Sequence, residues 1–152
     1  MASLDSPTVV RPVAATSADE QGLALSPDGK WLAYVSNETG SDEVYIRKLQ
    51  ESSSRWPVSI GGGREPRWIR SGELFYRKGD SVMVTHVELG AEPRVSAARL
   101  LFTGTYASTG HEPLWDASPD GSRFAFVRAP TGSDLPMGLL LNWADHWRAR
   151  RR

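Results

Sequence analysis

Ser26-Pro27-Asp28-Gly29 and Ser118-Pro119-Asp120-Gly121 are two copies of one tetrapeptide, each followed by an apolar run that is rich in aromatic residues. The runs are residues 31–35 (WLAYV) and residues 124–127 (FAFV). Proline presets φ at the second position of a type I turn, aspartate suits the third, and glycine supplies the left-handed residue of a bulged hairpin. We therefore predict that each tetrapeptide is a structural turn between the first two strands of a small antiparallel sheet, with no chemistry in Asp28 or Asp120.

A third, degraded copy lies between the other two. It covers residues 68–76 (WIRSGELFY) and aligns with the other two copies if it has lost one residue after Gly72. Ile69 and Ser71 occupy the serine and aspartate positions of the complete copies, which bears on the geometry of this middle turn. Gly29, Gly72 and Gly121 then lie about 43 and about 49 residues apart, within reach of the roughly 40–50-residue period of propeller blades. The chain is thus predicted to consist of repeats.

Short β-rich stretches separated by turn-forming residues fill the space between these turns, about four to a repeat. The sequence predicts an all-β fold, a partial β-propeller of about three four-stranded antiparallel blades with a short C-terminal helix. The whole chain is expected to form one partial propeller domain. Its expected parts are the outer strand of a preceding blade with a linker (1–21), three blades (22–63, 64–112 and 113–143), and a terminal helix with a basic tail (144–152).

Composition excludes several classes of protein. With 152 residues, 39% of them hydrophobic, the chain can build one domain with a real core. Its 18 basic and 18 acidic residues cancel, which disfavours nucleic acid and anionic membranes as partners. The absence of cysteine rules out disulfides, thiolate metal sites and cysteine nucleophiles.

The first residues lack the features of a secretory signal, and no apolar run reaches about 18 residues. As written, the chain is therefore expected to be cytoplasmic and not to span a membrane. A full-length parent could instead be membrane-anchored or periplasmic.

A search for catalytic motifs is negative. The sequence contains neither a Gly-x-Ser-x-Gly elbow nor the glycine-rich loop and His-Arg-Asp of kinases. Residues 61–64 (GGGR) lack a Walker lysine and a following helix pattern, so we interpret them as a flexible link between blades. His86, His111 and His146 show no metal-ligand spacing. We expect no enzyme activity, no cofactor and no metal site.

One cluster could still hold a cation or a polar ligand at a propeller mouth, and it consists of His111, Glu112 and the nearby Asp116. The alternative is a solvated loop that leads into the third blade. The six tryptophans recur mostly at strand positions, which favours packing between blades over a recognition surface. They are Trp31, Trp56, Trp68, Trp115, Trp143 and Trp147.

Residues 25–38 (LSPDGKWLAYVSNE) and 43–47 (EVYIR) resemble the WD40-like (PD40) repeat of TolB-like β-propellers. The resemblance continues through residues 61–68 (GGGREPRW), 73–77 (ELFYR) and 141–143 (LNW), so it covers nearly the whole chain. This ordered series is similar to the C-terminal propeller segment of large bacterial proteins, some of which carry a serine/threonine kinase domain upstream. The resemblance implies a non-catalytic binding or scaffold module whose rigid blades present loops to a protein or peptide.

Two other functions stay open at this point. The chain could be the regulatory or sensor portion of a larger enzyme, such as a bacterial serine/threonine kinase. It could also be a lectin-like propeller that binds a ligand or an ion, which would require aromatic residues and carboxylates that converge in a central channel.

Three repeats are fewer than the roughly four to eight blades with which propellers usually close. Unclosed blades leave apolar faces and strand edges exposed, which invites pairing with another chain. Either the chain is a fragment of a longer protein, or a second copy completes a six-bladed ring. The sequence favours the fragment, because residues 8–14 look like the outer strand of a missing blade.

Overall fold

The structure is a computed structural model that describes residues 17–50, 54–109 and 113–128, and the backbone of residues 137–140. These residues form strands joined by turns and links, and the described chain has no helix that is long and apolar enough to cross a membrane. The strand predicted at residues 8–14 and the helix predicted at residues 144–152 lie outside the described residues.

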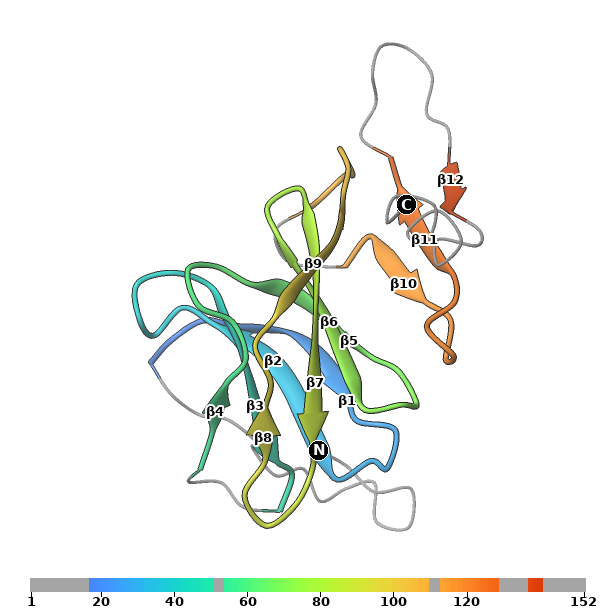
Figure 1. The fold of residues 1–152 in the computed structure, drawn as a ribbon. Coiled ribbons are helices and arrows are strands. Elements are labelled where there is room, and N and C mark those ends of the chain that lie inside the picture. The colour runs from blue at the N-terminus through green and yellow to red at the C-terminus, as the bar shows by residue number, and fades with distance from the viewer. Residues whose placement is uncertain (1–16, 51–53, 110–112, 129–136, 141–152) are drawn as a thin grey trace, which may run out of the picture.

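The first sheet, here called blade 1, is a meander of antiparallel strands in which each strand pairs with the next (Figure 1). Its second strand is buried along its whole length. A run that is apolar on both of its alternating faces is typical of a strand covered from both sides. The strands are β1 (Glu20–Leu25), β2 (Trp31–Ser36), β3 (Glu43–Lys48) and β4 (Trp56–Pro57).

The second sheet, blade 2, has the same meander, but its outer strand is split into two pieces that both pair with the third strand. At the break, the Thr85 hydroxyl donates to the carbonyl of Ser96 at 2.6 Å, and the Ser96 N–H donates to the carbonyl of His86 at 3.0 Å. These two bonds keep the broken strand against its neighbour. The strands are β5 (Arg64–Trp68), β6 (Glu73–Lys78), β7 (Ser81–Glu88), β8 (Arg94–Val95) and β9 (Arg99–Thr103).

The third sheet, blade 3, consists within the described residues of β10 (Trp115–Ala117), β11 (Phe124–Val127) and β12 (Met137–Leu140). All three strands are antiparallel to their neighbours. The predicted all-β architecture, a partial propeller of about three antiparallel blades, is confirmed. The exact residue limits given to the blades stay predictions.

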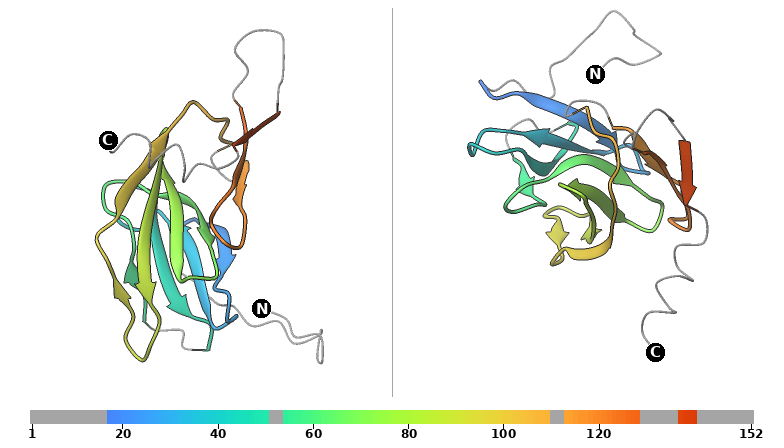
Figure 2. Two further views of the ribbon diagram at one scale, coloured as in Figure 1. Left: turned by 45° about the vertical axis from the view of Figure 1, so that its right-hand side comes forward. Right: turned by 90° about the horizontal axis from the view of Figure 1, so that it is seen from above.

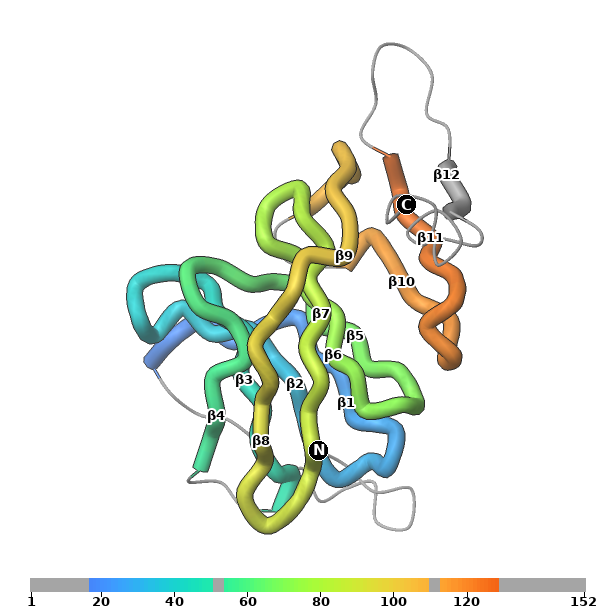
Figure 3. The backbone as a smooth tube through the Cα atoms, viewed as in Figure 1, coloured from blue at the N-terminus to red at the C-terminus, as the bar shows by residue number. Residues whose placement is uncertain are grey.

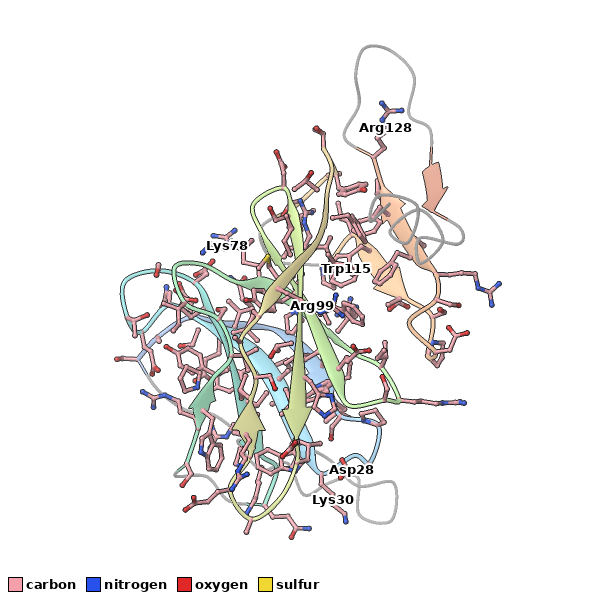
Figure 4. All side chains as sticks on the ribbon, in the orientation of Figure 1. Asp28, Lys30, Lys78, Arg99, Trp115 and Arg128 are labelled. Atoms are coloured by element: carbon pink, nitrogen blue, oxygen red, sulfur yellow. The ribbon has the colours of Figure 1, made fainter. Side chains whose placement is uncertain are left out.

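The three sheets lie as successive layers, with blade 2 between the other two (Figure 2). Consecutive residues of β6 point to opposite faces of blade 2. Leu74 packs in the apolar core shared with blade 1, and Phe75 packs in the core shared with blade 3. In the second core the rings of Phe75 and Phe124 meet edge to face, with centroids 5.2 Å apart. Trp115 of β10 also packs in this core (Figure 4). Blade 2 therefore contributes to both described cores.

The antiparallel order gives the stack two ends (Figure 3). We call the first strand of each blade (β1, β5 and β10) its inner strand. The turn end carries the hairpin that follows each inner strand, and both tetrapeptides lie in such hairpins. The link end carries the connections between blades, at residues 58–63 and 104–109. In Figure 4, Asp28 and Lys30 mark the turn end and Lys78 marks the link end.

Candidate functional site

The first tetrapeptide forms a closed hydrogen-bonded turn at the turn end of blade 1. The Ser26 hydroxyl donates to Oδ1 of Asp28 at 2.5 Å and accepts the N–H of Trp31 at 3.0 Å. The same carboxylate oxygen accepts the N–H of Lys30 at 3.1 Å. Gly29 takes the left-handed conformation, with φ of +68°, that the turn requires.

The second tetrapeptide repeats this network in blade 3. The Ser118 hydroxyl donates to Oδ1 of Asp120 at 2.5 Å and accepts the N–H of Arg123 at 2.9 Å. The N–H of Ser122 donates to the same carboxylate at 3.0 Å, and Gly121 again has φ of +68°. The identical tetrapeptides thus share these three hydrogen bonds, and the Ser122 hydroxyl adds a further bond to Asp120 in the second turn.

Both aspartates have lowered pKa values, because the donors of the turn stabilise the ionised carboxylate. The hydroxyl of Ser118 is the main cause of a pKa of about 2 for Asp120, and the N–H of Ser122 adds to it. The hydroxyl of Ser26 lowers the pKa of Asp28 in the same way, followed by the N–H of Lys30. Carboxylates committed to their own turn, and held ionised, are poorly suited to act as general acids or bases.

The middle turn keeps the glycine and loses the side-chain network. Gly72 has φ of +82°, and its N–H donates to the carbonyl of Ile69 at 3.2 Å. The N–H of Ile69 donates to the carbonyl of Glu73 at 3.1 Å, which makes this hairpin one residue shorter than the others. Ile69 itself is buried, 2% exposed, in the core shared with blade 3. The serine-to-isoleucine change therefore exchanges a polar turn for a contact between blades.

A buried carboxylate and a buried guanidinium meet at the link end of blade 2. Arg77 Nη1 lies 3.9 Å from Oε2 of Glu65, and both side chains are about nine-tenths buried or more. The Ser108 hydroxyl donates to Oε1 of Glu65 at 2.9 Å. The guanidinium of Arg77 donates to the carbonyls of Ala107 and Gly79, each at 3.0 Å. This network ties the link that leads to blade 3 onto strands β5 and β6 of blade 2.

The pair lines a cleft of about 280 Å³, whose other walls include Asp80 and Tyr106. The guanidinium of Arg77 lies over the ring of Tyr106, 5.9 Å from its centroid. Two buried atoms of the pair, Oε2 of Glu65 and Nε of Arg77, make no hydrogen bond to the described protein. Because unsatisfied buried polar atoms are costly, a water molecule or a bound polar group suits this position.

Glu65, which lines this cleft, also has an unusual backbone conformation. Its φ of +55° is rare for a residue other than glycine. Gly22, with φ of +62°, stands at the equivalent point of blade 1, and both residues lie in a register shift of the inner strand. In blades 1 and 2 the bulge therefore takes a left-handed residue, which is a glycine in blade 1 and Glu65 in blade 2. The sequence motifs do not indicate this site, and the one signal of the bulge is that Glu65 aligns with Gly22 of the first repeat.

A second cleft, of about 720 Å³, adjoins the first at the link end, because Arg64 lines both. Three of its lining residues, Asp19, Glu20 and Asp42, are acidic. Arg64 pairs with Asp42 at 2.5 Å, and the Asn37 side-chain amide donates to Asp19 at 3.3 Å. Acidic side chains outnumber basic ones in this cleft, so its charge favours a ligand with cationic groups.

The glycine-rich link between blades 1 and 2 is tied down by a carboxylate. Glu43 accepts the N–H of Gly62 at 2.7 Å and the hydroxyl of Ser59. A phosphate loop needs such backbone N–H groups to face a ligand. Here one of them is occupied by the protein itself, which fits a link between blades better than a nucleotide site.

The cluster predicted from the sequence is only partly visible. His111 and Glu112 lie outside the described residues. Asp116 lies on β10 with its side chain 78% exposed, 3.5 Å from Nε of Arg67 on the inner strand of blade 2. His86 is exposed on β7. In the described part of the chain, no group of three or more histidine and acidic side chains could hold a metal ion.

The chain was compared with protein families, with curated proteins and with solved structures. No family model matches the chain. A TolB homolog from Chlorobium chlorochromatii is 32% identical over 109 residues, which cover 70% of this chain and 23% of that protein. The chain therefore spans about a quarter of the length of the curated relative that it matches.

Two solved structures are similar over 80% of the chain. TolB from Acinetobacter baumannii is 20% identical with a TM-score of 0.49 over 30% of its own length. An oligogalacturonate lyase from Vibrio parahaemolyticus is 18% identical with a TM-score of 0.52 over 34% of its length, a likeness of fold alone. Together with the sequence match and the three stacked meanders, the likeness of fold to the lyase confirms the resemblance seen in the repeats: the chain is built of β-propeller blades similar to those of TolB.

Proposed function

We propose that the chain is a non-catalytic binding module that receives a protein or peptide segment at its link end. The observation that carries this proposal is the pair of adjoining clefts that share Arg64. One supplies acidic side chains, and the other supplies a buried carboxylate and guanidinium with unused hydrogen-bonding atoms. An extended segment with basic side chains could use both.

The local chemistry supports a binding role over catalysis. Arg77 is held by backbone carbonyls, Glu65 by Ser108, and Asp28 and Asp120 by their own turns. A general base or nucleophile needs a reacting partner held beside it. Each of these groups is instead positioned by the protein itself, and only Oε2 of Glu65 and Nε of Arg77 keep hydrogen-bonding capacity for a bound segment. TolB-like architecture also supports the proposal, although fold alone does not dictate function.

The test is a selection of random displayed peptides on the immobilised chain, followed by fluorescence anisotropy with the selected peptides. We expect enriched peptides to carry lysine or arginine, and Asp19→Lys to weaken their binding at least about tenfold. Glu92→Lys makes the same charge change at an exposed position in the β7–β8 hairpin of the turn end and should leave binding unchanged. Equal loss in both variants would indicate general electrostatic attraction and contradict a site at the link end.

A further inference from the structure

Blade 2 departs from the other two blades at a position on its second strand. The strand registers make Val35 of blade 1, Arg77 of blade 2 and Val127 of blade 3 equivalent. Two blades thus carry valine where blade 2 carries arginine. The residue that departs with it is Glu65, which replaces Gly22 of blade 1 in the bulge of the inner strand.

Blade 1 shows the same place in an apolar form. Val35 is 1% exposed, and a Cβ built on Gly22 would lie 3.3 Å from Cγ2 of Val35. Glycine and valine therefore close this place by packing, and blade 1 forms without an ion pair there. Because a buried ion pair is often no more stabilising than a packed apolar pair, the two changes in blade 2 indicate a role other than stability.

The ion pair in blade 2 leaves one acceptor and one donor unused. Glu65 accepts the hydroxyl of Ser108 at Oε1, and Arg77 donates from its two terminal nitrogens to the carbonyls of Ala107 and Gly79. Oε2 of Glu65 and Nε of Arg77 make no hydrogen bond to the described protein. A carboxylate oxygen only accepts and a guanidinium N–H only donates. A ligand that uses both atoms must therefore supply one donor and one acceptor.

The cleft lined by this pair is small and has no net charge. Its volume of about 280 Å³ lies below the roughly 300–1,000 Å³ of pockets for drug-sized molecules, so it suits a single side chain. Its lining includes two cationic residues, Arg64 and Arg77, and two anionic ones, Glu65 and Asp80. A charged side chain would lose hydration and meet a like charge beside its partner. An uncharged group with both a donor and an acceptor avoids these costs.

We infer that the cleft beside Glu65 binds an amide group, and that this amide is the side chain of one asparagine or glutamine in the bound segment. The inference rests on the proposed function, since it concerns the same link-end site. The carboxamide nitrogen donates to Oε2 of Glu65, and the carboxamide oxygen accepts the N–H at Nε of Arg77. The basic side chain of the segment enters the acidic cleft on the other side of Arg64, which lines both clefts. The recognised segment therefore carries a carboxamide and a basic residue at a fixed spacing.

The test uses the displayed peptides selected on the immobilised chain, each measured by fluorescence anisotropy. We expect the enriched peptides to carry asparagine or glutamine at a constant spacing from lysine or arginine. Replacement of that carboxamide residue by leucine, or by the corresponding acid, should raise the dissociation constant at least about tenfold, because buried polar atoms are left unpaired. Asp19→Lys should weaken the parent peptides and the leucine peptides by the same factor, which makes it the control for charge attraction.

A double variant tests the pair in the protein. Glu65→Gly with Arg77→Val gives blade 2 the residues of blade 1. Circular dichroism should show that this variant stays folded, because both charges are removed together. It should bind a carboxamide peptide and its leucine counterpart equally well, and Asp19→Lys added to it should still weaken both.

The outcomes separate this inference from the proposed function. Peptides that depend on Asp19 but bind equally well after the leucine replacement would overturn the carboxamide and leave the proposed function standing. If those peptides instead lose binding when one peptide bond is N-methylated, the amide belongs to the backbone, and the side-chain assignment is wrong. A folded double variant that still distinguishes the two peptides would also overturn it. If no peptide binds, or if Asp19→Lys and Glu92→Lys weaken binding equally, the proposed function fails and this inference fails with it.

Discussion

Gly29 and Gly121 have the same left-handed backbone in turns with different surroundings. A Cβ added at Gly29 meets nothing within 4 Å, whereas one added at Gly121 lies 2.6 Å from Cδ1 of Ile69. Gly29→Ala should cost about 1 kcal/mol of backbone strain. Gly121→Ala should cost about 1–3 kcal/mol more, since Ile69 is buried and must shift. Urea denaturation of the two variants measures the difference.

A double variant isolates the steric part of that cost. Ile69→Val removes the methyl group that the new Cβ would meet. In the Gly121→Ala background it should therefore destabilise less than it does alone, with a coupling of about 1 kcal/mol. Equal and additive losses at the two glycines would show that the contact between the middle turn and blade 3 does not constrain Gly121.

Asp120 makes the second turn sensitive to acid. Its folded pKa of about 2 lies below the usual 3.8, so the stabilisation by this carboxylate is fully present above the usual value. It is lost as the pH falls from about 4 toward about 2. We expect a carboxyl titration followed by NMR to place this pKa near 2 in the wild type. Ser118→Ala should move it upward, because the hydroxyl is the main donor, and an unmoved pKa would contradict that assignment.

At the scale of the element, the bulge in β5 sets backbone strain against a buried ion pair. Glu65→Gly relieves the strain of a φ of +55°, worth about 1 kcal/mol. It also leaves the buried Arg77 without its carboxylate, and loss of one partner of a buried pair costs about 3–5 kcal/mol. A net destabilisation of roughly 2–4 kcal/mol is expected in thermal or urea unfolding. A more stable Glu65→Gly chain would mean that the carboxylate contributes nothing to holding the 104–109 link.

The sequence predicted the elements whose causes are local. Proline, aspartate and glycine fix the tetrapeptide turns, and the continuous apolar run of residues 31–35 indicates the strand that follows the first of them. The bulge at Glu65 escaped notice because glutamate gives no local sign of a left-handed backbone. The split of the outer strand of blade 2 was also missed, since it depends on hydrogen bonds that join Thr85 and His86 of β7 to Ser96, which lies between β8 and β9.

The cluster predicted at His111, Glu112 and Asp116 stays a prediction, because His111 and Glu112 lie outside the described residues. Asp116 and its neighbours are close in sequence, whereas the cleft beside Glu65 assembles residues from β5, β6 and the 104–109 link. Such a site exists only after the blades have stacked. Local sequence patterns can therefore indicate the blades, but the pairing of Glu65 with Arg77 has to be found in the folded chain.

At the scale of the whole molecule, β6 couples the two apolar cores. Leu74 and Phe75 are adjacent and almost fully buried, but they face different blades. Loss of either core uncovers one face of the same strand and so weakens its pairing with both neighbours. The described stack should consequently unfold as one unit and not blade by blade.

Truncation of Leu74 or of Phe75 tests whether β6 couples the two cores. Leu74→Ala should cost about 2–5 kcal/mol and Phe75→Ala about 3–5 kcal/mol, each through a cavity in a different core. These losses are a large part of the roughly 5–15 kcal/mol that stabilises an ordinary domain. In both variants, urea curves followed by circular dichroism and by tryptophan fluorescence should shift together and stay superimposable, because Trp31 and Trp115 report on the two cores. If Phe75→Ala separated the two curves, blade 3 would be melting before the rest. The strand shared by both cores would then not be enough to make the stack cooperative.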